Sequence, residues 1–186
     1  MENTHKKFGH LMLDLETMAK DSNAAIVSIG AVEFNMKTGE TGKEFYVNVS
    51  LQSCLDIGLQ VDGDTIMWWL RQSDAARQKL TEGDVKNIQV ALIEFSAFVE
   101  SCEGKHCEIW GNSARFDIGI IADAYKKCHL TNPWDFRQER DVRTLVSFHP
   151  IIKQMTKFVG TEHNSVHDCL HQIKYCSEIW NKKNNE

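Results

Sequence analysis

Two apolar stretches, His10–Asp14 (HLMLD) and Ala25–Asn35 (AIVSIGAVEFN), decide the fold class of this 186-residue chain. The first is short and apolar, and the second is long and rich in β-branched residues, so both predict buried strands. Between the second stretch and Lys43–Val49 (KEFYVNV), the polar segment Met36–Gly42 carries two glycines and predicts a hairpin turn. The chain therefore opens with a three-stranded antiparallel meander.

After Val49 the pattern changes to alternating helices and strands. Apolar residues at spacings of three and four predict a helix over residues 88–99, and the same reasoning applies to the other helical segments. Further helices are expected over Asp64–Arg71, Asp74–Leu80, Phe116–Cys128, Asp141–Phe148 and residues 166–180, and further strands over Glu108–Gly111 and Phe136–Arg140. This order predicts an α/β fold with a mixed five-stranded sheet flanked by helices.

Composition narrows the class of protein. The length fits a single domain over residues 1–186, with its core over about residues 9–182. The formal net charge of −5 excludes a scaffold that holds nucleic acid by bulk positive charge, but it does not exclude a nuclease whose carboxylates bind metal. No stretch is apolar enough to span a membrane, and Met1–Lys7 is polar, so we expect no membrane anchor, no secretory signal and a cytoplasmic location.

Six cysteines are spread along the chain without a Cys-x-x-Cys pair. In the absence of a signal peptide we expect reduced thiols that fill the core. A disulfide or a zinc site is the alternative.

Three short acidic motifs carry the chemistry. Asp14 and Glu16 end the first strand, and because side chains alternate along a strand the two carboxylates share a face. Like charges placed side by side are costly unless a cation lies between them, and oxygen ligands suit Mg²⁺ or Mn²⁺. Asp117 opens the helix after the next strand, and Asp168 lies near the start of the last helix. Taken singly, the Asp14/Glu16 pair is also typical of a solvated strand end, Asp117 of a carboxylate favoured by the helix dipole, and Asp168 of a polar helix start.

Histidines accompany the third motif. A histidine beside a metal site can accept the proton of an attacking water near neutral pH. His163, His167 and His171 are also spaced by four, which leaves open a zinc site on one helix face. The glutamate that zinc proteases place after the first histidine is missing, because Asn164 stands there.

The order Asp-x-Glu, Asn-x-x-x-Phe-Asp and His-x-x-x-x-Asp resembles the DnaQ-like DEDDh 3′–5′ exonucleases, which have an RNase H-like fold. The resemblance covers residues 11 to about 180. A narrower likeness joins Thr65–Ala76, Trp110–Asn112, Pro133-Trp134 and Arg140–Thr144 to the subgroup that contains the phage exonuclease DexA and the bacterial exoribonucleases called RNase AS. This likeness implies that the protein comes from a bacterium or a phage and acts in a bacterial or phage-infected host cell.

The resemblance implies a mechanism. Two Mg²⁺ or Mn²⁺ ions are expected on four carboxylates, with His163 as the general base and His167 as the second choice. The ligands carried over by motif are Asp14, Glu16, Asp117 and Asp168. Nucleoside 5′-monophosphates are released from the 3′ end of single-stranded nucleic acid, with DNA slightly favoured over RNA.

Five residues are expected to hold the substrate: Thr17, Trp69, Gln72, Asn112 and Arg143. Trp68 and Trp69 are about 100° apart on a helix, so one packs inward and the other is free to stack on a base. We assign the stacking to Trp69, and Gln72 shares its face. Some of these residues also have a structural alternative. The tryptophans could both serve packing, Asn112 could cap nearby backbone, and Arg143 could pair with a carboxylate.

Three functions are compared. The first is the exonuclease, for which low positive charge predicts short contacts and distributive digestion. The second is a hydrolase of very short oligonucleotides, which a series of substrate lengths would separate from the first. The third is an inactive nucleic-acid-binding module, which would be expected to have lost a metal ligand. Because dimers are common among the relatives, a homodimer is left open.

Overall fold

Strand β1 (His10–Thr17) lies inside a six-stranded mixed sheet of order β4-β3-β2-β1-β5-β6 in the computed structural model, which describes residues 8–102 and 107–185. It is antiparallel to β2 (Ile26–Phe34) and parallel to β5 (Glu108–Gly111). The sheet is completed by β3 (Thr41–Val49), β4 (Val85–Lys86) and β6 (Glu139–Asp141). Strands β1, β2 and β3 form the predicted antiparallel meander.

Two strand predictions need correction. The sheet has six strands instead of five, because Val85–Lys86 pairs in parallel with the end of β3, and two residues are too few to show a strand period. Within the predicted strand Phe136–Arg140, the first three residues form a 3₁₀ turn and strand β6 starts only at Glu139. Asp135 and Gln138 cap that turn reciprocally, which favours the turn over an extended chain.

Eight α-helices and one π-helical turn stand in the described residues. Six of the α-helices were expected, whereas α1 and α7 were not. The helices are α1 (Leu51–Asp56), α2 (Gly63–Trp69), α3 (Asp74–Lys79), α4 (Ile88–Ser101), α5 (Gly119–Lys127), α6 (Val142–Val146), α7 (Pro150–Met155) and α8 (Ser165–Asn185), and the π-helical turn η1 (Ala114–Ile118) precedes α5.

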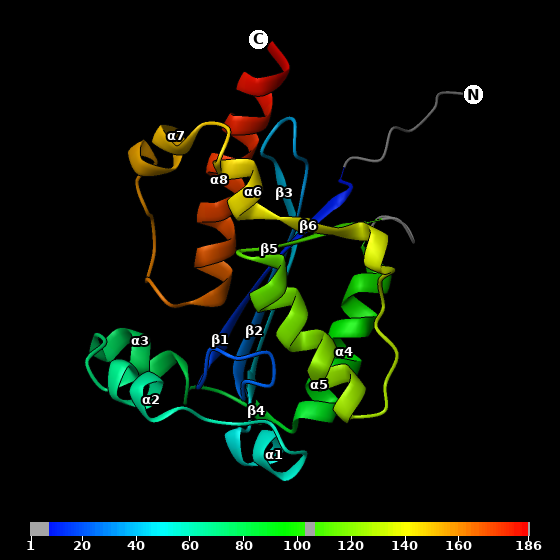
Figure 1. The fold of residues 1–186 in the computed structure, drawn as a ribbon, viewed down its shortest axis with the longest axis vertical. Helices are drawn as coiled ribbons and strands as arrows, with labels where there is room; N and C mark the ends of the chain where they lie inside the picture. Colours follow the sequence, from blue (N-terminus) through cyan, green and yellow to red (C-terminus); the bar gives the residue numbers. More distant parts are fainter. Residues whose placement is uncertain (1–7, 103–106, 186) are drawn as a thin grey trace.

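Helices cover both faces of the sheet, with α4 and α5 on one side and the long α8 on the other (Figure 1). Each side has its own apolar core. Leu11, Leu13 and Leu15 of β1 belong to the core under α4 and α5, whereas Met12 belongs to the core under α8. This alternation turns the even-numbered side chains of β1, including both of its carboxylates, toward α8.

Gly30 lets the start of α8 approach the sheet. It is the partner of Asp14 in the β1–β2 register. A Cβ atom at Gly30 would lie 2.5 Å from the backbone carbonyl carbon of Ser165, the first residue of α8. Only glycine therefore fits under this end of the helix, three residues before Asp168.

The remaining structural expectations concern cysteines and membranes. All six cysteines are buried free thiols, as expected for core residues, and none forms a disulfide. None of the helices in the described residues is long and apolar enough to cross a membrane. The polar segment Met1–Lys7 lies outside the described residues.

Candidate active site

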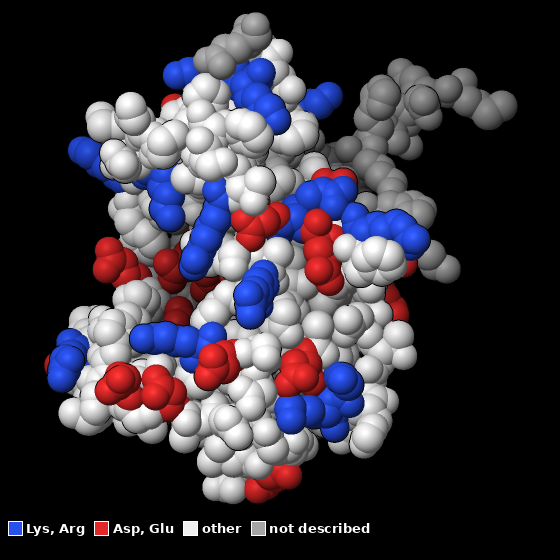
Figure 2. Space-filling view, viewed as in Figure 1, with Lys and Arg blue, Asp and Glu red and all other residues white. Residues whose placement is uncertain are grey.

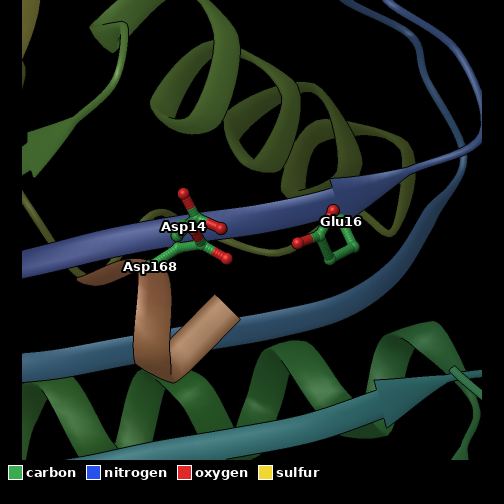
Figure 3. A group of neighbouring side chains, drawn as sticks. All are labelled: Asp14, Glu16 and Asp168. Atoms are coloured by element: carbon green, nitrogen blue, oxygen red, sulfur yellow. The ribbon is translucent and has the colours of Figure 1, made fainter. Parts of the chain in front are cut away.

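Three carboxylates converge where the end of β1 meets the start of α8 (Figure 3). Asp14 and Glu16 come from β1, and Asp168 comes from the first turn of α8. One oxygen from each lies within 4.8 Å of the others. Within the described residues, this is the group of acidic, histidine and cysteine side chains that could hold a metal ion.

Burial and mutual repulsion disfavour negative charge on these carboxylates. Burial, together with the charges of Asp168 and Asp117, raises the pKa of Glu16 to about 8. Burial also raises the pKa of Asp14 well above its ordinary value, with the three neighbouring carboxylates adding to the effect. For Asp168, burial is again the main cause of a pKa of about 6. A cation placed among them would remove this repulsion.

Two further features of the cluster bear on its ligand. The buried Oδ2 atom of Asp168 has no hydrogen-bond partner in the described structure. The Nε2 atom of Gln172 donates to Oδ1 of Asp14 at 2.8 Å, which fixes that carboxylate and lowers its pKa slightly against the larger rise from burial. Because buried polar atoms are normally satisfied, the open oxygen of Asp168 marks a place for a cation.

Asp117 lies beside the cluster but is already engaged by the backbone. Its Oδ1 accepts from the Leu15 N–H at 3.1 Å, and its Oδ2 accepts from the Asn112 N–H at 2.7 Å. Burial raises its pKa to about 7, against the lowering effect of these hydrogen bonds. Asp117 thus ties η1 to β1, and each oxygen keeps a second lone pair for a ligand.

His163 lies in the loop before α8, where its backbone has a φ of +62°. Its ring packs edge-on against Trp68, with ring centroids 4.9 Å apart, and against Trp69 at 5.8 Å. A backbone hydrogen bond from His163 lowers the pKa of Asp168 slightly against burial, so the loop is joined to the cluster. Burial lowers the pKa of the imidazole, while the nearby Glu162 raises it. A largely neutral imidazole at pH 7 can accept a proton.

The other two histidines, His167 and His171, contact neighbouring protein groups. Nδ1 of His167 accepts from the Thr161 N–H at 3.0 Å, which anchors the loop that carries His163. His171 packs against the rings of Phe158 and Tyr175. The three histidines spaced by four therefore do not converge on a common point, and no zinc site of this kind is present among the described residues.

The tryptophan pair differs from the prediction. Trp69 is the inward-facing member: it is 4% exposed, and its indole N–H donates to the carbonyl oxygen of Thr17 at 3.0 Å. Trp68 is 40% exposed and is therefore the ring with an accessible face. Helical geometry separated the two side chains but did not say which one faced β1, because that depends on where α2 docks.

A pocket of about 200 Å³ lies between the two tryptophans and the carboxylate cluster. Glu16, Thr17 and both tryptophans line it, together with Phe116. The Thr17 hydroxyl donates to the carbonyl oxygen of Ala19 at 2.7 Å.

Gln72 lies outside this pocket. It follows the end of α2, so it does not share a helical face with Trp69, and its side-chain amide donates to the Trp68 carbonyl oxygen at 3.0 Å. The prediction for Gln72 overlooked that the helix ends at Trp69.

Asn112 and Arg143 contact each other. The Nε atom of Arg143 donates to Oδ1 of Asn112 at 3.4 Å, and its Nη2 donates to the Asn112 carbonyl oxygen at 3.3 Å. The guanidinium group remains exposed, and its charge lowers the pKa of Asp117 slightly against burial. Both residues therefore stand next to the acidic cluster.

Sequence reasoning missed Gln172. It stands four residues after Asp168 in α8, and residues at this spacing share a helix face. That spacing was the available signal, but the partner on β1 became evident only from the packing of α8 against the sheet.

The chain is similar to known exonucleases. The model of the family described as "3′-5′ exoribonuclease Rv2179c-like domain" matches residues 9–180. An exodeoxyribonuclease of Enterobacteria phage T4 is 24% identical over 196 aligned residues, covering 87% of this chain and 85% of that protein.

Solved structures share the fold. The nuclease domain of 3′hExo, a DEDDh family member bound to rAMP, superposes with a TM-score of 0.60 at 12% identity, covering 97% of this chain and 95% of that one. A full-length 3′-exonuclease gives 0.62 at 10% identity, covering 95% and 83%. The E. coli ExoI–ssDNA complex gives 0.61 at 14% identity, covering 95% of this chain but 40% of that one. The fold is thus of the DnaQ-like exonuclease type.

Proposed function

Because the chain belongs to the Rv2179c-like 3′-5′ exoribonuclease domain family, and is therefore a nuclease, we propose that it removes nucleoside 5′-monophosphates from the 3′ end of single-stranded nucleic acid. The observation that carries this proposal is the convergence of Asp14, Glu16 and Asp168 within 4.8 Å at the edge of a pocket large enough for part of a nucleoside. The domain that does this spans residues 1–186, with its core at about residues 9–182.

We assign this donor set to two divalent cations, Mg²⁺ or Mn²⁺. Hard carboxylate oxygens are the ligands that these ions prefer. The raised pKa values of Glu16 and Asp168 and the unpartnered Oδ2 of Asp168 both indicate a site that is incomplete without positive charge. Asp14, Glu16 and Asp168 would hold the ions directly, and the free lone pairs of Asp117 make it the fourth ligand.

Once bound, such ions neutralise the charge that develops on the phosphate and acidify a coordinated water. The chain supplies the proton acceptor. His163 is assigned this role because it stands on the loop joined to Asp168 and its lowered pKa keeps the ring neutral near pH 7. His167 is unsuited, because its Nδ1 already accepts the Thr161 N–H.

The terminal nucleoside is assigned to the pocket beside Glu16 and Thr17. Trp68 offers the accessible aromatic face for stacking, and Trp69 supports it from beneath through an edge-to-face contact at 5.1 Å. Asn112 and Arg143 are assigned to the phosphate or the strand, because Asn112 contacts Asp117 and Arg143 contacts Asn112.

DNA is proposed as the preferred substrate, because the T4 relative, with matching coverage of both chains, is named an exodeoxyribonuclease. RNA is the second candidate, because the matching family is described as an exoribonuclease. The protein would act in the cytoplasm of a bacterial or phage-infected cell.

The proposal is tested with DNA and RNA oligonucleotides of one sequence, labelled at either end, in Mn²⁺ or Mg²⁺. A 5′-labelled strand that shortens one nucleotide at a time, and a 3′-labelled strand that releases labelled mononucleotide at once, establish the polarity. EDTA must abolish both. The ratio of the initial rates on DNA and RNA decides the substrate, and a higher rate on RNA would overturn the DNA assignment.

A length series separates the remaining candidates. If kcat/KM is highest for dinucleotides and falls with length, the protein is a hydrolase of very short oligonucleotides. If single strands bind but no length is cleaved in either metal, the exonuclease proposal fails and a binding module takes its place.

A further inference from the structure

We propose that a cationic groove next to the catalytic pocket holds the phosphates of the substrate strand that lie 5′ of the terminal nucleotide. The groove has a volume of about 760 Å³. Four basic side chains line it, Lys20, Arg115, Lys127 and Arg143, with two acidic ones, Asp21 and Asp123. The inference rests on the proposed exonuclease function and extends it from the terminal nucleotide to the strand behind it.

The four cations come from separate parts of the chain. Lys20 follows β1, Arg115 lies in η1, Lys127 ends α5, and Arg143 lies in α6. A surplus of positive charge gathered from four segments contrasts with the net charge of −5 for the whole chain. Because phosphates carry one negative charge each, such a local surplus is the electrostatic signature of a strand-binding surface.

Among the described residues, none of these four cations forms a salt bridge with a carboxylate. In the part of the chain that the structure describes, the salt bridges of Lys and Arg engage five other side chains, Arg77, Lys79, Lys86, Arg137 and Arg140. Lys127 instead donates to the carbonyl oxygen of Gly58 at 3.3 Å, and Arg143 donates to Asn112. Both contacts are to neutral oxygens, so they orient the cations and leave their charge available.

The groove is continuous with the catalytic pocket. Lys20 and Phe116 line both hollows, and Glu16 lines the pocket side. Arg115 and Asp117 flank Phe116 in η1, with Arg115 exposed and Asp117 buried beside the carboxylate cluster. A strand whose last nucleoside enters the pocket therefore has the cations of the groove directly beside it.

Figure 2 shows the same relation on the surface. Acidic side chains lie inside a hollow, and basic side chains stand around its rim together with further acidic ones. Glu16 of the carboxylate cluster lines the catalytic pocket, whereas Arg115, Lys127 and Arg143 line the groove. This division of charge fits one anionic polymer bound across both regions.

The experiment compares a dinucleotide with a 12-nucleotide single strand as substrates for the variant Arg115→Glu/Lys127→Glu. A dinucleotide has no phosphate beyond the scissile one, so it reaches the metal site without the groove. We expect KM for the 12-mer to rise on the order of tenfold. The slope of the logarithm of its binding constant against the logarithm of the salt concentration should become shallower by about 0.7 per lost phosphate contact. Cleavage of the dinucleotide should stay within about twofold of the wild type, since the carboxylate cluster is untouched.

Lys37→Glu/Lys182→Glu is the matched control. It makes the same change in charge at exposed positions in the β2–β3 turn and near the carboxyl end of α8, away from the site. An equal rise in KM for the control and the groove variant would mean that only net charge matters, and would overturn the proposal. A groove variant with an unchanged 12-mer KM would also overturn it.

Binding of the fluorescent 12-mer in EDTA, followed by anisotropy, tests the groove without cleavage. If the wild type binds the strand more tightly than the groove variant but cleaves nothing when metal is added, the groove stands and the exonuclease proposal fails. If the wild type cleaves the strand but the two proteins bind it equally well, the exonuclease proposal stands and the groove proposal fails. Arg115→Gln, at an exposed position, replaces the double variant if that one does not fold.

Discussion

At the scale of single residues, the site concentrates negative charge that the fold alone does not neutralise. Three carboxyl groups have pKa values raised to about 6, 7 and 8, at Asp168, Asp117 and Glu16. Their ordinary values are near 4, so the fold favours the protonated forms. The molecule therefore prepares a site in which a divalent cation takes the place of protons.

This arrangement predicts how the stability of the metal-free protein depends on pH. A carboxyl group whose pKa is higher in the folded state contributes stability that is fully present below its ordinary value and is lost as pH rises through the folded value. In EDTA, the melting temperature should therefore fall between pH 5 and pH 8.5, through the values of about 6, 7 and 8. Mn²⁺ should flatten the profile, because it binds the ionised form. A melting temperature that rises with pH in EDTA would contradict this.

Gln172 provides a second prediction at this scale. Its amide N–H fixes Asp14 at 2.8 Å, so Gln172→Leu should leave the carboxylate buried without that donor. Residues that orient a metal ligand typically change metal affinity by roughly 10- to 100-fold. We expect Mn²⁺ affinity, measured by calorimetry, to fall by that factor. Gln172→Asn, which keeps an amide on a shorter side chain, serves as the control for a change in packing, and full Mn²⁺ affinity in the leucine variant would argue against the role.

The tryptophan pair separates binding from packing. Trp68→Ala should raise KM for a single strand by about 10- to 100-fold, since stacking is worth roughly 1–3 kcal/mol per base. Trp69→Ala removes a ring that is 4% exposed, so it should lower the free energy of unfolding by roughly 3–5 kcal/mol. Steady-state kinetics measures the change in KM, and denaturant unfolding measures the change in stability. A large rise in KM for Trp69→Ala and a loss of stability for Trp68→Ala would return the stacking role to Trp69.

At the scale of elements, the geometry of the cluster depends on how α8 meets β1 and β2. Gly30 is the critical contact, because a Cβ atom there would lie 2.5 Å from Ser165. Gly30→Ala should push the start of α8, and Asp168 with it, away from β1. Overpacking of this kind costs roughly 1–3 kcal/mol. We expect both a lower melting temperature and a weaker Mn²⁺ affinity.

Gly119→Ala is the comparison, because its Cβ atom would meet its nearest neighbour at 3.7 Å, which is ordinary contact. It lies in the first turn of α5, away from α8. If Gly30→Ala binds Mn²⁺ as the wild type does, the close approach of α8 is not what positions Asp168.

Sequence patterns anticipated the longer elements and the convergence of the acidic motifs. The meander followed from β-branched runs separated by a glycine-containing turn, and α4 and α8 followed from their apolar spacing. Both carboxylates of β1 were expected on one face, and the alternation of the two cores confirms it. These inferences succeeded because they depend on local periods of two and 3.6 residues.

What sequence did not reveal depends on contacts between distant segments. Trp69 faces inward because its indole reaches the Thr17 carbonyl oxygen, 52 residues away. The cations of the groove lie up to 123 positions apart, from Lys20 to Arg143, so no local pattern joins them. Asp117 was expected as a metal ligand, but its two hydrogen bonds to backbone N–H groups are visible only in three dimensions.

At the scale of the whole molecule, charge sets how the protein would act on a strand. The chain carries −5 overall while the groove beside the site is basic, so attraction is confined to a short length of nucleic acid. We expect distributive digestion, in which a challenge with excess unlabelled strand halts the shortening of labelled molecules within a few nucleotides. Continued shortening over hundreds of nucleotides would contradict this, unless a homodimer encloses the strand, which sedimentation would reveal.

The most direct test of the central claim, that Asp14, Glu16 and Asp168 form the metal site of a nuclease, is a calorimetric titration of Mn²⁺ at pH 7 into wild type and Asp168→Asn. The wild type should bind Mn²⁺ and release protons, because carboxyl groups with raised pKa values give way to the cation. The variant, still folded, should lose most of that affinity. Undiminished Mn²⁺ binding by folded Asp168→Asn would contradict the account.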